Sequence, residues 1–482
     1  MKTMTYYCKA AVIGTGAGGA VAGATLAEAG IDTILVEQGG VHGTAGHQGV
    51  LDGLTNMYAD AAMTVALGRP FIPMPIGKAV GGSTIINSST CFRPPRDRVA
   101  AWGGPSYEEL EPFFSDIEES ISVTTVDTEI LGGNGRILKR GCDALGVELK
   151  PLRHNIRDCK GRGQCQYGCP EGAKQSMEKN FIPRALGAGA RLLAGRRVDR
   201  LLMNDGKAVG VAGQGPEGRF EIRADVIVLA MGAFQTPAFL LRNDVANSSE
   251  RVGRGLHVHP ATRVLAEMDE IVDGFKGLPQ GAYVDRWADR GIMLEGIFTP
   301  PGLMIAGAPG AGHALKNLAA DYRRLSGFGV MVADTASGRV LRGRFGLPFI
   351  VLYQTSRRDA ETMRFGIARL AEIFFAAGAK RVFTNFLPMM SLESPGDLKA
   401  FESAPVKPSY LEMMAFHPLG TCRMGSSPAD SVVDFDLAAH DVPNLYIMDG
   451  SVVPGSLGVN PQITIMGLAL RAARRLAARL RA

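Results

Sequence analysis

The sequence lacks several features that would place it in a specialised class of protein. Its 482 residues include only seven cysteines and two tryptophans, and 52 basic against 47 acidic residues leave a net charge of +5. Seven cysteines argue against a disulfide scaffold, and so small a charge does not indicate a nucleic-acid partner. There is also no internal repeat and no low-complexity segment. We therefore expect a globular protein with a sizeable core and more than one domain.

Nothing in the sequence is typical of a transmembrane segment or a secretory signal. The longest uncharged stretch, 296–315, contains three prolines and several glycines and is a poor candidate for a membrane span. It is interpreted as an apolar wall of a substrate site, a surface-docking loop or plain core. Residues 1–7 are too short for a signal and lead into a strand. The expected location is the cytoplasm, or the periplasm in complex with an exported partner subunit.

Glycine, by contrast, is abundant, and its first cluster has a specific spacing. Gly14, Gly16 and Gly19 form a G-x-G-x-x-G pattern after the apolar run 10–13. In such a pattern the first glycine permits a tight turn, the second lets the backbone approach a pyrophosphate, and the third lets helix and strand pack closely. A helix over 20–30 and a strand over 33–36 follow, and the strand ends at Glu37, where a ribose-binding carboxylate is expected. The segment predicts a dinucleotide site.

Two later segments favour FAD over NAD as the dinucleotide. A small-residue loop with Gly82, Ser83 and Asn87 can lie against an extended ligand. The apolar run 225–230 predicts another buried strand, which is followed by Gly232 and a helical segment. A mononucleotide would not need so many separate points of close approach.

Six sequence blocks in this order resemble the glucose–methanol–choline (GMC) family of flavin oxidoreductases. They are GTGAGG, GGSTIINSS, GAFQTPAFLL, VGRGLHVHP, HPLGTCRMG and NLYIMDGSVVPGSLGVNPQITIMGLALRAA, which together extend over nearly the whole chain. The last block is most similar to bacterial alcohol- and sterol-oxidising members. The resemblance implies an α/β fold with a doubly wound, Rossmann-like FAD domain and a substrate domain with an antiparallel sheet.

The resemblance also implies oxidation of an alcohol by hydride transfer to flavin N5. His417 matches the catalytic histidine of the family, and Asn460 matches the position that holds the substrate hydroxyl with it. An imidazole can accept the hydroxyl proton near neutral pH. Asn460 also precedes Pro461 and a helical segment over 463–475, so it is a candidate N-cap as well. Some family members attach FAD covalently through a histidine where this chain has Ile86, so noncovalent FAD is expected.

Further positions are expected to contact the cofactor. The predicted set is Gly14, Gly16, Gly19, Glu37, Gly82, Ser83, Asn87, Val198, Gly232, Asp449, Gly450 and Pro461. His257 and His259 form an H-x-H pair without further ligands nearby in sequence, which favours a structural or flavin-lining role over a metal site.

Cys159, Cys165 and Cys169 form a C-x5-C-x3-C-P run. It is similar to a ferredoxin run with Arg162 in place of one cysteine, and three thiolates suit a three-iron (3Fe–4S) cluster. A sugar dehydrogenase branch of the resembled family carries such a cluster on this spacing, whereas alcohol-oxidising relatives carry cysteine-rich loops that need not hold iron. Zinc, or no metal, are the alternatives.

Whether the cysteine loop holds a cluster determines which acceptor is expected for the electrons of the reduced flavin. With a cluster, the enzyme would be a dehydrogenase that passes electrons to a cytochrome, a quinone or a small partner subunit. Without one, O2 can serve directly as acceptor, which would make the chain an alcohol oxidase. A flavin-containing lyase with no net redox chemistry is a further alternative, and the sequence does not identify the small-molecule alcohol substrate.

The predicted FAD domain is discontinuous and comprises 1–90, 185–260 and 408–482. The predicted substrate domain is 261–407, and a connecting region, 91–184, contains the cysteine loop at 159–170.

Overall fold

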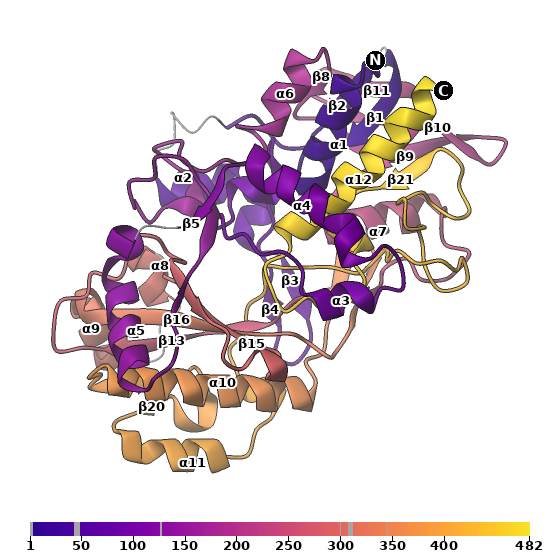
Figure 1. Cartoon of the computed structure of the whole chain (residues 1–482). Helices are drawn as coiled ribbons and strands as arrows, with labels where there is room; N and C mark the ends of the chain where they lie inside the picture. The colour runs from indigo at the N-terminus through magenta and orange to yellow at the C-terminus, as the bar shows by residue number, and fades with distance from the viewer. Residues whose placement is uncertain (1–2, 43–48, 126–127, 299, 307–311, 345) are drawn as a thin grey trace.

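The computed structural model describes residues 3–42, 49–125, 128–298, 300–306, 312–344 and 346–482. Two seven-stranded sheets form the two halves of the molecule, and a smaller five-stranded sheet joins them (Figure 1). Among the described residues, no helix is long and apolar enough to cross a membrane.

The first sheet has a parallel core and an antiparallel extension. Its parallel strands are, in spatial order, β8 (Arg191–Leu193), β2 (Thr33–Val36), β1 (Met4–Ile13), β11 (Gly218–Leu229) and β21 (Leu445–Ile447). β10 (Lys207–Gly215) and β9 (Arg197–Asn204) continue it as a meander. Strands of a parallel core are buried on both faces and are therefore apolar along their length. For this reason the runs at 10–13, 33–36 and 225–230 could be predicted as strands from the sequence. This sheet confirms the predicted Rossmann-like half.

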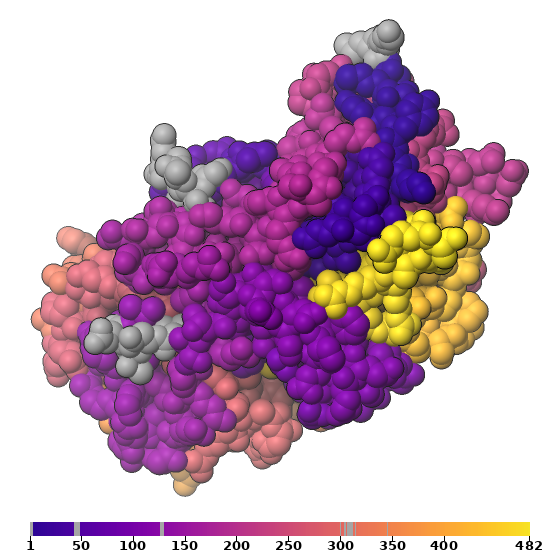
Figure 2. All heavy atoms as spheres, turned by 45° about the horizontal axis from the view of Figure 1, so that its top comes forward, coloured from indigo at the N-terminus to yellow at the C-terminus, as the bar shows by residue number. Residues whose placement is uncertain are grey.

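Helices from both ends of the chain pack together beside this sheet. α1 (Ala17–Glu28) lies along α12 (Gln462–Arg481), and α4 (Tyr107–Ser120) and α6 (Phe181–Gly187) complete the layer (Figure 1). Figure 2 shows the yellow C-terminal helix directly against indigo N-terminal residues. A Cβ on Gly18 would lie 1.9 Å from the Met448 carbonyl oxygen, so the packing of the two chain ends requires glycine there.

The second large sheet is antiparallel throughout. Its order is β20 (Ser391–Leu392), β19 (Arg381–Phe383), β13 (Ala261–Glu267), β16 (Leu325–Val332), β15 (Ile292–Gly296), β14 (Ala282–Val284) and β6 (Lys150–Pro151). α10 (Arg357–Ala376) covers one face of it, together with α5 (Gly132–Ala144). Gly378 follows α10 with φ +88°, as a glycine C-cap does. The sheet confirms the antiparallel sheet that the sequence resemblance implied.

The third sheet has five short strands. Its order is β12 (Arg254–Leu256), β17 (Gly338–Arg342), β18 (Phe349–Leu352), β3 (Val65–Leu67) and β4 (Ile72–Pro73). One of its faces packs against α7 (Gly232–Asn243), where the rings of Phe234 and Phe349 lie 5.7 Å apart.

The remaining elements are short and connect the three sheets. The helices are α2 (Val50–Asn56), α3 (Arg96–Ala100), α8 (Pro301–Ala306), α9 (Gly312–Ala320) and α11 (Leu398–Ser403), and the strands are β5 (Val123–Thr125) and β7 (Arg153–Asn155). The helix α8 lies within the uncharged stretch 296–315 and α9 begins in it and extends beyond it; residues 299 and 307–311 of the stretch lie outside the described residues.

Candidate active site

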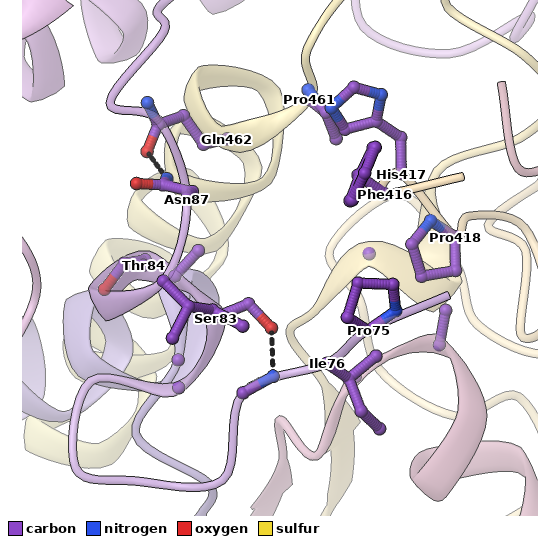
Figure 3. A pocket seen from close by; sticks show the side chains of 18 of the residues that line it. Pro75, Ile76, Ser83, Thr84, Asn87, Phe416, His417, Pro418, Pro461 and Gln462 are labelled. Atoms are coloured by element: carbon purple, nitrogen blue, oxygen red, sulfur yellow. Dashed lines mark hydrogen bonds between the residues drawn. The ribbon is translucent and has the colours of Figure 1, made fainter. Parts of the chain in front are cut away.

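A cavity of about 470 Å³ runs from the glycine turn after β1 to the antiparallel sheet. Its wall includes all the predicted cofactor-contacting residues except Gly19, together with the predicted catalytic pair. The wall therefore joins segments that lie more than 400 residues apart in the chain. Figure 3 shows part of it, with Ser83, Asn87 and Gln462 on one side and Phe416, His417 and Pro418 on the other.

The glycine turn has the geometry that the spacing predicts. Gly14 has φ +105°, and a Cβ there would lie 2.2 Å from the Ala230 carbonyl oxygen. A Cβ on Gly19 would lie 2.1 Å from the Gly14 carbonyl oxygen, so Gly19 serves helix packing rather than the cavity wall. At Gly16 the nearest protein atom to such a Cβ is 3.9 Å away, which leaves the backbone open towards the cavity.

The first turn of α1 provides an anion site at this end of the cavity. Its N-cap is Gly16, which has no capping side chain, and the first turn contains no acidic residue. The N–H groups of this turn are therefore available to a pyrophosphate, and the helix dipole favours negative charge there.

Glu37 is buried in the cavity wall and is held in one orientation. Its Oε2 accepts hydrogen bonds from the Thr15 hydroxyl at 2.8 Å and the Thr15 N–H at 3.1 Å, and its Oε1 accepts from Gly39 N–H at 2.9 Å. Burial raises the pKa of this carboxyl, and the hydrogen bonds oppose the effect. The carboxylate is thus fixed next to the glycine turn, in the position expected of a ribose ligand.

The loop with Ser83 and Asn87 is tied to the N-terminus of α12. Asn87 Nδ2 donates to Gln462 Oε1 at 3.0 Å, and Ser83 Oγ accepts from Gly77 N–H at 3.0 Å (Figure 3). Asp449 connects another part of the cavity wall to α7. It accepts hydrogen bonds from the Gly232 N–H at 2.9 Å and from the Thr236 hydroxyl at 2.5 Å. These bonds fix Asp449 against the first residues of α7.

His417 and Asn460 meet in the cavity as predicted from the sequence. The His417 Nε2 atom lies 3.3 Å from Asn460 Nδ2. Because an amide nitrogen only donates, this contact leaves Nε2 as an unprotonated acceptor. Burial, and then the neighbouring His259, lower the pKa of His417 to about 3, so the imidazole is neutral at physiological pH. The residue can therefore accept a proton.

Asn460 does not cap α12. The N-cap is Pro461, and no side chain makes a capping hydrogen bond there. The expectation that Asn460 could act as an N-cap is thus wrong, because its amide is turned towards His417 and Glu295. Its Oδ1 is buried and accepts no hydrogen bond from a described residue.

Glu295 is the carboxylate of the site that the sequence reasoning missed. Strand alternation turns Ile292 and Leu294 towards α10 and Glu295 towards the cavity. Burial raises its pKa to about 7, partly offset by a hydrogen bond with Asn460. One acidic residue inside the otherwise apolar strand Ile292–Gly296 was the available signal, because an isolated buried charge is costly unless it has a role.

The two histidines of the H-x-H pair have different surroundings. His259 lies in the cavity wall, and its ring centroid is 5.4 Å from that of His417. Its Nε2 accepts from the N–H groups of Leu457 and Gly458 at 2.8 and 3.0 Å. Burial lowers the pKa of His259 to about 4, so it stays neutral and holds the segment before Asn460 in place.

His257 faces away from this arrangement, towards a buried carboxylate. Its Nδ1 lies 3.5 Å from Asp334. The H-x-H pair thus has the structural and cavity-lining placement that its sequence context favoured over a metal site.

The structure does not support the predicted iron–sulfur cluster. Among the described residues, which include all seven cysteines, no three His, Cys, Asp or Glu residues are grouped so as to hold a metal ion. Cys165 instead packs into an apolar cluster with Leu131, Ile156 and Leu278. Burial raises the pKa of its thiol to about 11.

Lys174, which follows the cysteine loop, is buried. Its Nζ donates to the carbonyl oxygens of Ile85, Asn87 and Cys165 at 2.7, 2.9 and 2.7 Å. The lysine therefore fixes the loop at 85–87 that lines the cavity. Burial lowers the pKa of Lys174 to about 8.

Comparison with known proteins identifies a family that matches along most of the chain. Two models described as GMC oxidoreductase match residues 33–261 and 336–469. An uncharacterized GMC-type oxidoreductase of Mycobacterium tuberculosis is 35% identical over 98% of this chain and 76% of its own length. A long-chain-alcohol oxidase of Arabidopsis thaliana is 26% identical over 96% of this chain and 66% of its own. A variant of Aspergillus oryzae formate oxidase, solved to examine modification of its FAD, superposes with a TM-score of 0.74 at 15% identity, covering 100% of both chains.

Proposed function

The chain belongs to the GMC oxidoreductase family, and from that premise we propose that it binds FAD noncovalently and oxidises the CH–OH group of an alcohol. The observation that carries the proposal is the contact of His417 with Asn460 inside the cavity that begins at the glycine turn. The M. tuberculosis relative shares the family, and the Arabidopsis relative is named for alcohol oxidation.

The residues present suit FAD. The open backbone at Gly16 and the uncapped first turn of α1 would hold the pyrophosphate, and Glu37 would hold the adenosine ribose. Pro461, the N-cap of α12, and Gly450, whose Cα faces the Pro418 carbonyl oxygen, line the cavity near His417 and would lie against the flavin ring. Bound there, FAD supplies the isoalloxazine N5 that takes up the hydride.

The chain's own residues would position the alcohol and handle its proton. A substrate hydroxyl that takes the place of the Asn460 N–H at His417 Nε2 can give its proton to that lone pair, and Asn460 Nδ2 can then donate to the hydroxyl oxygen and orient it. Since His417 has a low pKa, the proton does not rest there. Glu295, which shares Asn460 as a neighbour and has a pKa of about 7, is the carboxyl group that can take it on.

The substrate end of the cavity favours an alcohol with an apolar body. Beyond His417 its wall includes Ile76, Ile297, Met331 and Phe416. Arg263 and Glu295 line the same wall, so a hydrocarbon portion of the substrate would find apolar contacts while the hydroxyl group reaches the polar end.

We also propose the domain division that the sequence suggested. The first sheet is drawn from 1–90, 185–260 and 408–482, and six strands of the antiparallel sheet come from 261–407. One strand of that sheet, β6, belongs to the connecting region 91–184.

A visible spectrum of the purified protein, followed under anaerobic addition of an aliphatic alcohol, tests the proposal. We expect the flavin band and its bleaching by the alcohol. Readmission of O2 or addition of a quinone then identifies the acceptor by the faster return of the band. A flavin that stays oxidised under every alcohol tried would favour the lyase alternative and contradict the proposal.

A further inference from the structure

The five-stranded sheet has one face that the described part of the chain leaves uncovered. Ala66, Val340 and Val351 point inward and are buried, whereas their strand neighbours Leu67 and Leu352 are 52% and 38% exposed. Such alternation is ordinary when the outer residues are polar. Here they are leucines, and a sheet face of this kind on a monomer marks an interaction site.

The apolar face extends beyond the two leucines. Leu341 lies opposite Ile350 on the neighbouring strand and is 38% exposed. The turns at the ends of the strands add Phe71 and Leu347, which are 63% and 58% exposed. We call Leu67, Phe71, Leu341, Leu347 and Leu352 the leucine face.

Arginines border the leucine face on the same strands. One cross-strand row reads Arg254, Arg339, Leu352 and Leu67, so two arginines stand directly opposite each other beside two leucines. Neither Arg254 nor Arg339 makes an ion pair with a described residue. Like charges in this position are destabilising unless an anion lies between or over them.

The four strands β3, β4, β17 and β18 have little acidic charge near them. Segments 61–75 and 338–352 contain Arg69, Arg339, Arg342 and Arg344 and no Asp or Glu, whereas Glu250 precedes Arg254 on the fifth strand by four residues. Among the described residues, the arginines of these two segments make one ion pair, a long one of 3.9 Å between Arg342 and Asp244. The face is therefore both apolar and cationic.

We propose that the leucine face and its arginines dock the protein on an anionic lipid bilayer. Leucine and phenylalanine side chains on a basic surface suit the boundary between acyl chains and headgroups, where arginines meet lipid phosphates. A second copy of the chain is a poorer occupant, since a twofold interface would set these arginines against themselves.

The position of the face agrees with this occupant. β4 ends at Pro73, and two residues later the chain enters the cavity wall at Pro75 and Ile76 (Figure 3). Ala415 N–H donates to the Pro73 carbonyl oxygen, and the next residue, Phe416, is a partly exposed member of the same wall. A bilayer on this face would lie close to the apolar end of the cavity.

Vesicle flotation of the full-length holoprotein tests the proposal. We expect flotation with vesicles of 70% phosphatidylcholine and 30% phosphatidylglycerol, roughly these proportions being typical of an anionic membrane surface, and little with pure phosphatidylcholine. High salt should weaken the binding. The double variant Arg339→Gln/Arg344→Gln should lose about thirtyfold in affinity, as expected for two basic residues near such a surface.

The variant Leu341→Ser/Leu352→Ser should lose affinity for the vesicles at low and at high salt. Leu145→Ser and Leu186→Ser are the matched controls, because both leucines are 44% exposed and lie on other elements, and they should bind as the wild type does. Unchanged flavin absorbance and melting temperature establish that each variant is folded. Absence of flotation, equal binding of the leucine-face variant, or sedimentation as a dimer that the variant abolishes would overturn the proposal. Retention on immobilised polyglutamate without flotation would overturn it in favour of an acidic protein partner.

Discussion

Replacing Glu295 by glutamine should change how the stability of the protein depends on pH. Burial raises the pKa of Glu295 from 4.5, the ordinary glutamate value, to about 7. Between these two pH values the unfolded chain loses the proton while the native state keeps it. The native state therefore binds more protons, and the free energy of unfolding falls as pH rises from 4.5 to 7. Above pH 7 both states are ionised, and the loss is complete.

The size of this effect follows from the displacement of the pKa. One pKa unit corresponds to about 1.4 kcal/mol, so the contribution of Glu295 amounts to about 3 kcal/mol. Glutamine has nearly the same shape and cannot ionise. Relative to wild type, Glu295→Gln should therefore gain about 2.5 kcal/mol in the free energy of unfolding when the pH is raised from 5 to 8, since part of the effect already falls below pH 5.

Denaturant unfolding of wild type and variant at the two pH values measures this difference. Glu361→Gln is the matched control, because Glu361 is an exposed residue of α10 that pairs with Arg357. It should show no such gain. If the difference between wild type and Glu295→Gln were the same at both pH values, Glu295 would ionise normally, and it would not be the proton acceptor proposed here.

Three other changes test the rest of the site. Lys174→Met should weaken FAD binding and lower the melting temperature, because three buried carbonyl oxygens lose their hydrogen-bond donor at a cost of about 1–3 kcal/mol each. Cofactor titration and melting curves measure both effects, and an unaltered FAD affinity would contradict the prediction. Gly14→Ala should abolish FAD binding or folding, since its Cβ would lie 2.2 Å from a backbone oxygen, and a variant that retains the yellow flavin colour would refute that role. Elemental analysis should find no stoichiometric iron or zinc, and Cys159→Ser/Cys169→Ser should reduce its flavin as the wild type does; three irons per chain would restore the cluster.

The sequence was sufficient to predict the elements that local pattern determines. Fully apolar runs next to glycines are characteristic of strands in a parallel core. On this basis the sequence predicted strands at 10–13 and 33–36, with Glu37 at the end of the second strand. The meeting of His417 with Asn460 was predicted from the family resemblance rather than from any local rule. Such a contact depends on how α12 packs beside α1.

The errors arose where tertiary surroundings decide the role of a residue. The spacing of the cysteines suggested metal ligands, but among the described residues no three such side chains are grouped, and Cys165 packs against leucine and isoleucine side chains. Asn460 is a favourable residue for an N-cap, yet its amide faces the cavity. Glu295 was missed because its role depends on which side of β15 faces the cavity and Asn460, and that depends on how the sheet packs. The leucine face escaped detection because its strands are far apart in sequence.

Anaerobic stopped-flow reduction of the flavin by an aliphatic alcohol tests the central claim most directly. The measurement compares wild type with His417→Ala and with His440→Ala, a histidine outside the cavity wall. We predict that His417→Ala keeps FAD bound and slows flavin reduction by about 10²–10⁴-fold, the usual contribution of a general base, while His440→Ala reduces at the wild-type rate. Flavin reduction at the wild-type rate in His417→Ala would contradict the account.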